Sequence, residues 1–164
     1  MIITFIKWSL IILVALVVLL ILAGQLGLLR GTAPADLGVK DGKLKAPAKS
    51  PNSVSSQADL WPESQQLAYA RIPPLKLQGT GAQTLAKIKA VVEAMPRAQI
   101  VQSSNDYLYV TFTTTLLKFT DDAEFWFDPV NQVIQVRSAS RLGEKDFGIN
   151  AGRVASIRAA LARP

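Results

Sequence analysis

The sequence contains no cysteine and no histidine among its 164 residues. A disulfide, a catalytic thiol, a thiolate or imidazole metal site and a Ser/His/Asp triad are therefore excluded. A metal ion, if one binds, would have to be a hard cation held by carboxylate and carbonyl oxygens. We expect no cofactor and no dedicated metal site.

Positive and negative charges nearly balance over most of the chain, although the formal net charge is +6. Residues 30–49 hold five basic and two acidic residues, a net charge of +3, whereas residues 50–164 hold twelve and ten, a net charge of +2. The excess lies beside the hydrophobic N-terminus, where anionic lipid headgroups attract Lys and Arg. We expect a lipid bilayer as a partner, and no nucleic acid.

The N-terminus holds 22 consecutive uncharged residues, from Trp8 to Leu29, with Leu16 and Leu22 typical of its Leu-rich interior. A helix of this length, at about 1.5 Å per residue, crosses a hydrocarbon core of about 30 Å. The run predicts a transmembrane anchor over residues 1–29, with Trp8 at the cytoplasmic interface. The alternative is a cleaved signal peptide, but the apolar part of such peptides is shorter.

The orientation of the anchor depends on whether the domain that follows it is exported across the membrane. Lys7 precedes the helix and several lysines follow it, so a simple count of positive charges favours a cytoplasmic C-terminus. That count loses force when the following segment is translocated as a domain. We expect the N-terminus inside and the domain outside.

Residues 30–56 are rich in Gly, Pro, Ala, Ser and Lys and show no helical or strand periodicity. They predict a flexible basic linker. Residues 57–164 are then expected to form a single domain with its own core.

Helical periodicity marks two segments of that domain. Leu85, Ile88, Val92 and Met95 form one apolar stripe over residues 82–95, which Pro96 ends. Val154, Ile157 and Leu161 form a second stripe over residues 150–162, with Asn150 as the expected N-cap.

Strand patterns lie between these helices, over residues 99–103, 107–115, 121–128 and 133–139. Helix, strands and helix in that order favour an α+β fold. We expect an antiparallel β-meander of about four strands with two packing helices.

The last two strands fix a testable register. A hairpin loop of two or four residues pairs positions whose numbers sum to 261, so Phe125 faces Val136 on an apolar side. Glu124 then faces Arg137 on the other, polar side, where Asp122 also lies and where Arg141 continues the strand.

These four residues, with Ser138 and Ser140 expected nearby, have two interpretations. In the functional one the guanidinium groups bind an anion, or the carboxylates bind a hard cation. In the structural one they are cross-strand ion pairs that hold the sheet in register.

Several runs of the domain resemble a known family. The runs are Phe119–Phe125 (FTDDAEF), Arg137–Gly143 (RSASRLG) and Asp146–Asn150 (DFGIN) with Arg153, preceded by Ser50–Gln57 and Ile72–Leu75. They resemble the domain-of-unknown-function family 1499, which implies a bacterial envelope or plastid context and carries no established activity. Members often have cysteines near the Pro-Asn step, where this chain has Ser53, so a cysteine-dependent role does not transfer.

The resemblance implies which residues to test first. They are Asp122, Glu124, Arg137, Ser138, Ser140, Arg141, Asp146, Asn150 and Arg153.

Our leading hypothesis is a non-enzymatic one. It describes a single-pass protein of the bacterial inner membrane whose periplasmic domain binds an envelope protein or an anionic ligand. The alternative is a hydrolase-like envelope enzyme that uses Asp122 and Glu124, with a possible divalent cation, and it predicts that both carboxylates open into a pocket. If the N-terminus is a signal peptide, the domain is soluble in the periplasm.

Overall fold

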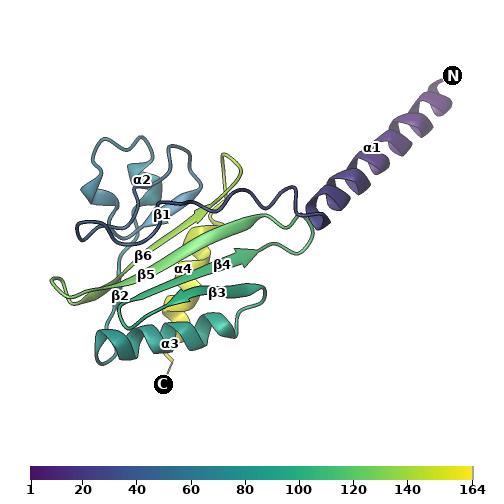
Figure 1. The fold of residues 1–164 in the computed structure, drawn as a ribbon. Helices are drawn as coiled ribbons and strands as arrows, with labels where there is room; N and C mark the ends of the chain where they lie inside the picture. Colours follow the sequence, from purple (N-terminus) through teal and green to yellow (C-terminus); the bar gives the residue numbers. More distant parts are fainter. Residues whose placement is uncertain (164) are drawn as a thin grey trace.

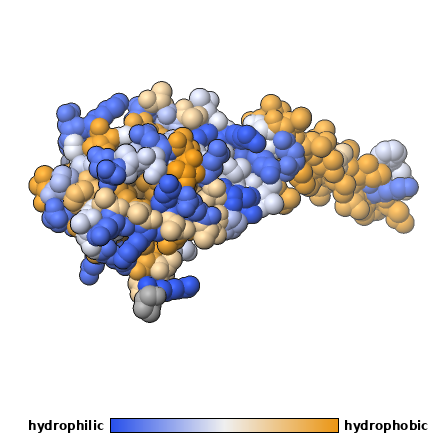
Figure 2. Space-filling model, turned by 60° about the horizontal axis from the view of Figure 1, so that its bottom comes forward, coloured by the Kyte–Doolittle hydropathy of each residue, from blue (hydrophilic) through white to orange (hydrophobic). Residues whose placement is uncertain are grey.

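The computed structural model describes residues 1–163, and Figure 1 shows an N-terminal helix that stands away from an α+β domain. This helix, α1 (Ile2–Gln25), has 24 residues and is about 36 Å long at the rise of an α-helix. It is the one helix in the described chain that is long and apolar enough to cross a membrane, and a signal sequence would meet the same criteria. Figure 2 shows its hydrophobic surface over nearly its whole length.

The expected meander is confirmed, with its four strands as β3 (Ala98–Ser103), β4 (Tyr107–Thr113), β5 (Thr120–Asp128) and β6 (Val133–Ser140). The predicted register is also confirmed, because Phe125 pairs with Val136 and Glu124 pairs with Arg137. Two short strands that the sequence analysis missed, β1 (Ser53–Ser55) and β2 (Leu75–Lys76), both pair antiparallel with β6. The sheet has six strands in the order β1-β6-β5-β4-β3, with β2 also against β6.

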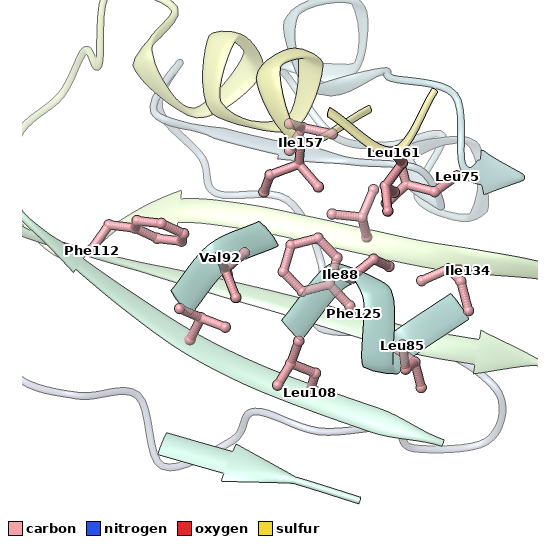
Figure 3. Close-up of a cluster of buried hydrophobic side chains, with 14 of the residues drawn as sticks. Leu75, Leu85, Ile88, Val92, Leu108, Phe112, Phe125, Ile134, Ile157 and Leu161 are labelled. Atoms are coloured by element: carbon pink, nitrogen blue, oxygen red, sulfur yellow. The ribbon is translucent and has the colours of Figure 1, made fainter. Parts of the chain in front are cut away.

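Both predicted helices, α3 (Gly81–Glu93) and α4 (Ile149–Leu161), pack on one face of the sheet. Thr80 starts α3 with a capping box that it shares with Gln83. Ile88 and Ile157, from the two helices, meet Phe125 of the sheet in the core (Figure 3). Two shorter helices, η1 (Ala58–Leu60) and α2 (Leu67–Ala70), follow β1.

The predicted N-cap of α4 is wrong by two positions. Gly148 occupies the N-cap with φ 82°, and Asn150 lies in the first turn with no exposed surface. Gly148 has no side chain to cap the helix, and Asp146 supplies that contact, because its Oδ2 accepts the backbone N–H of Asn150 at 2.8 Å. The Asn150 side chain is thereby directed into the domain.

Residues 30–52, here named the covering segment, differ from the flexible linker that the composition predicted. The chain crosses the face of the sheet opposite the helices (Figure 1), and Gly38 N–H donates to Glu124 Oε1 at 2.7 Å. Leu44 is 1% exposed, and its N–H donates to Gln57 Oε1 at 2.8 Å. The segment lacks a periodic sequence pattern because side chains of Glu124 and Gln57, and not the backbone of a neighbouring strand, accept these N–H groups. The folded domain therefore begins well before residue 57.

Candidate functional site

The nine candidate residues lie on two faces of the β5–β6 pair. Asp122, Glu124, Arg137 and Arg141 lie under the covering segment, and we name them the cover-side cluster. The helix-side cluster lies between β6 and the start of α4 and comprises Ser138, Ser140, Asp146, Asn150 and Arg153. Ser138 does not accompany Arg137 and Arg141 as predicted, because neighbouring side chains of a strand point to opposite faces. Ser140 bonds to Asn150 on the helix side and also lines a cavity together with Arg137 and Arg141.

Asp122 and Arg141 form the tighter pair of the cover-side cluster. Arg141 Nε donates to Asp122 Oδ2 at 2.9 Å and Arg141 Nη2 donates to Oδ1 at 2.7 Å, a bidentate geometry. Tyr109 O–H donates to Asp122 Oδ1 at 2.5 Å. Burial and this hydrogen bond raise the pKa of Tyr109 to about 12, so its hydroxyl remains a donor at neutral pH. Both carboxylate oxygens of Asp122 are therefore occupied.

Glu124 and Arg137 form a looser pair. Glu124 Oε1 accepts from Gly38 N–H and from Tyr107 O–H, each at 2.7 Å. Its Oε2 lies 3.6 Å from Arg137 Nη1, beyond good hydrogen-bonding distance for a charged pair. Arg137 is 4% exposed, and its Nε and Nη1 have no hydrogen-bond partner in the described residues. A buried guanidinium is thus left with unused donors.

Arg137 is also one of the residues that line a cavity of about 400 Å³. Its lining includes Lys45, Lys49, Arg137 and Arg141, with Asp122 as the acidic member. Lys45 pairs with Asp36 at 2.5 Å, and Lys49 is exposed. Asp122 and Arg141 neutralise each other, so the unpaired groups of the lining are Lys49 and Arg137, and these suit an anion better than a cation.

The helix-side cluster is closed on itself. Arg153 Nη2 lies 2.5 Å from Asp121 Oδ2, and Arg153 Nη1 donates to Asn150 Oδ1 at 2.6 Å. Ser138 O–H donates to the same Asn150 oxygen at 2.6 Å, and Asn150 Nδ2 donates to Ser140 Oγ at 3.0 Å. These groups satisfy one another, and the arrangement ties α4 to β5 and β6.

Asp146 belongs to the same cluster and holds the turn before α4. Burial by itself would raise the pKa of Asp146, but hydrogen bonds from Tyr69, Asn150 and Gly148 hold it below its ordinary value. The carboxylate is therefore ionised at neutral pH and acts as an acceptor for this turn.

Four residues that complete these clusters were not predicted from the sequence. Tyr107 and Tyr109 lie on the Glu124 face, and the β4–β5 register, with Tyr109 opposite Glu124, would have placed them there. Asp121 could have been assigned to the opposite face by the same alternation. Tyr69 comes from α2, and no local pattern relates that helix to Asp146.

The enzyme alternative required two carboxylates that open into a pocket. Asp122 lines the cavity described above, but both of its oxygens are bound, and Glu124 does not line that cavity. The two residues are 1% and 0% exposed, and each is paired with an arginine. In residues 1–163 no group of three or more His, Cys, Asp or Glu side chains is arranged to hold a metal ion.

Comparison with protein families gives a match over most of the chain. The model of the family described as "Protein of unknown function (DUF1499)" matches residues 43–161. No curated protein and no solved structure matches the chain. The matched range begins inside the covering segment and includes both clusters.

Proposed function

This chain belongs to the DUF1499 family, and we propose that it is a membrane-anchored protein whose domain binds an anionic component of the bacterial cell envelope. Arg137 is the observation that carries this proposal. Arg137 is buried and lines a cavity, and two of its guanidinium nitrogens have no hydrogen-bond acceptor among the described residues.

An anion in the cavity would complete the contacts that Arg137 lacks. Burial lowers the pKa of Arg137, while Glu124 acts in the opposite direction, which reflects the cost of keeping this charge away from water. A phosphate or carboxylate oxygen would offer strong acceptors to the unpaired N–H groups. Hydrogen bonds to the ligand would then offset the desolvation cost of the unpaired Arg137 N–H groups.

The size and the lining of the cavity define the class of ligand. About 400 Å³ holds a phosphate-bearing or carboxylate-bearing group of small-molecule size. Arg141 and Lys49 lie on its walls, and covering-segment residues such as Pro34 and Pro47 supply its less polar part. The cavity therefore accommodates a compact anionic group.

The proposed location is the bacterial inner membrane, with α1 as a single span and the domain in the periplasm. The length and apolar surface of α1 support this anchor. A single cysteine in place of Val130, which is 87% exposed, would test the topology, because the natural chain has no thiol. In intact cells with a permeabilised outer membrane, a membrane-impermeant maleimide should label this cysteine. Labelling only after cell lysis would contradict the periplasmic location.

Binding is tested on the full chain in detergent micelles. Inorganic phosphate, pyrophosphate and citrate are titrated at constant ionic strength, and heat or intrinsic fluorescence reports binding. We expect at least one anion to bind, and we expect Lys49→Glu to weaken it about tenfold, or about 1.4 kcal/mol, through like-charge repulsion.

The matched control is Lys76→Glu, because Lys76 is exposed on β2 and does not line this cavity. It should leave the dissociation constant unchanged. Failure of all three anions to bind, or equal losses in both variants, would refute a specific anion site.

A further inference from the structure

The loop between β4 and β5, residues 114–119, lies against the last turn of α1 (Figure 1). Gln25 Nε2 donates to the backbone oxygen of Leu116 at 2.8 Å and to that of Thr115 at 3.3 Å. Gly24 is buried against the backbone of Leu117. The domain therefore contacts the helix end directly.

Exposed apolar side chains gather at this end of the domain. Leu116 is 61% exposed, Leu142 and Phe147 of the β6–α4 loop are 41% and 90% exposed, and Ile149, the first residue of α4, is 56% exposed. The two loops meet, because Phe119 lines one hollow of about 310 Å³ with Leu142, Phe147 and Ile149. Leu142 also lies close to Gly31, just after α1. Large side chains left in water at one site usually mark a surface that binds something.

Phe147 is held in an unfavourable backbone conformation while its ring is in solvent. Its φ is 53°, in the left-handed region that bulky residues avoid. Asp146 fixes the turn, because its Oδ1 accepts Gly148 N–H at 3.0 Å and its Oδ2 accepts Asn150 N–H at 2.8 Å. The fold therefore supports an exposed phenyl ring, and such strain is typical of residues with a role in binding.

We infer that the bilayer surface covers these loops, so that the domain is docked on the membrane. This inference rests on the membrane span proposed for α1. The uncharged run continues past Gln25 to Leu29, so the end of α1 lies near the boundary of the hydrocarbon core. The β4–β5 loop contacts that end, and its apolar residues therefore lie at the headgroup level. The β6–α4 loop extends the same surface.

The charges around the loops fit an anionic bilayer. Lys145 lines the same hollow as Leu142, Phe147 and Ile149. Lys118 belongs to the β4–β5 loop, and it lines a second hollow together with Arg30. Glu144 is the exposed acidic residue of the two loops. Apolar residues inserted at the interface with basic residues around them are typical of surfaces that bind anionic lipids.

The absence of cysteine makes this docking measurable at single positions. Leu116→Cys and Phe147→Cys introduce one thiol each in the loops, and Val130→Cys places the control thiol in the β5–β6 turn, at the opposite end of these strands. The full-length variants are placed one per nanodisc, in equal parts of phosphatidylglycerol and phosphatidylcholine, and carry an environment-sensitive fluorophore.

Nitroxide lipids should quench the labels at residues 116 and 147 severalfold more than the label at residue 130, and aqueous iodide should show the reverse order. Lys118→Glu combined with Lys145→Glu should reduce the lipid quenching at residue 147, whereas Lys76→Glu should not. Equal quenching at all three positions would overturn the docking. Protection of residue 147 only after membrane extract is added would also overturn it, because a protein would then be the occupant. Retention of the chain in the nanodisc tests the membrane span of α1 separately from the docking of the loops. None of the labelled positions lies in the proposed anion site, so the result does not depend on that site.

Discussion

Asp146 shows how a single carboxylate can organise the turn on which a helix begins. It accepts hydrogen bonds from the backbone of Gly148 and Asn150, from the Asn150 side chain and from the hydroxyl of Tyr69. These contacts join α2, the β6–α4 loop and α4 through one residue. Its negative charge also lies near the start of α4, where the helix dipole favours an anion.

The ionisation of Asp146 predicts acid sensitivity. Its folded-state pKa lies below the reference value of 3.8, so its stabilisation is complete above that pH and is lost as the pH falls through the folded-state pKa. Asp146→Asn should cost about 1–3 kcal/mol at neutral pH, because charged hydrogen bonds are lost. Urea unfolding between pH 7 and pH 3 should show this difference shrinking below about pH 4.

The control for this variant is Glu144→Gln, two residues away and exposed. It should change the free energy of unfolding by less than about 0.5 kcal/mol at each pH. A cost of Asp146→Asn that is independent of pH would show that the charge is unimportant.

The residues of the site were predictable to the extent that strand geometry determines them. Pairing of Glu124 with Arg137 followed from hairpin register, and alternation should have separated Ser138 from Arg137. The partner of Asp121 was not predictable in this way, because Arg153 comes from α4 and its reach depends on how that helix packs. Such contacts depend on tertiary packing, which leaves no local pattern in the sequence.

At the scale of elements, the covering segment is the part for which composition predicted the wrong structure, a flexible linker. Proline, glycine and lysine are typical of linkers, but here Leu44 is buried and the segment closes one face of the sheet. Its backbone bonds to distant side chains, so no period appears in the sequence. The helices and the four long strands were predictable because their burial repeats with a regular period.

A test of the covering segment is Leu44→Ala. Removing a fully buried leucine side chain should cost about 2–5 kcal/mol, measured by urea unfolding of the full chain. Leu60→Ala is the matched control, because Leu60 is 46% exposed and should cost much less. Equal and small costs in the two variants would mean that residues 30–52 are not part of the cooperative unit.

At the scale of the whole molecule, α1 and the domain meet without a free tether between them. The sequence predicted the helix, the domain and their order, but it contained no sign that Gly24 would pack on the β4–β5 loop. A Cβ atom at Gly24 would lie 2.7 Å from the Cα and the backbone oxygen of Leu117, closer than such atoms approach. Glycine at this position therefore permits the contact that sets the angle between helix and domain.

Replacing this glycine should release the domain from a fixed orientation. Gly24→Leu would force the β4–β5 loop away from α1, because the clash involves backbone that cannot rotate aside. Spin labels on cysteines introduced at Ile3 and Val130, both exposed, would give one narrow distance distribution for the parent chain in nanodiscs. The Gly24→Leu variant should broaden it, whereas Ala15→Leu, on the exposed middle of α1, should not. A distribution unchanged by Gly24→Leu would show that lipid contacts alone fix the domain on the bilayer.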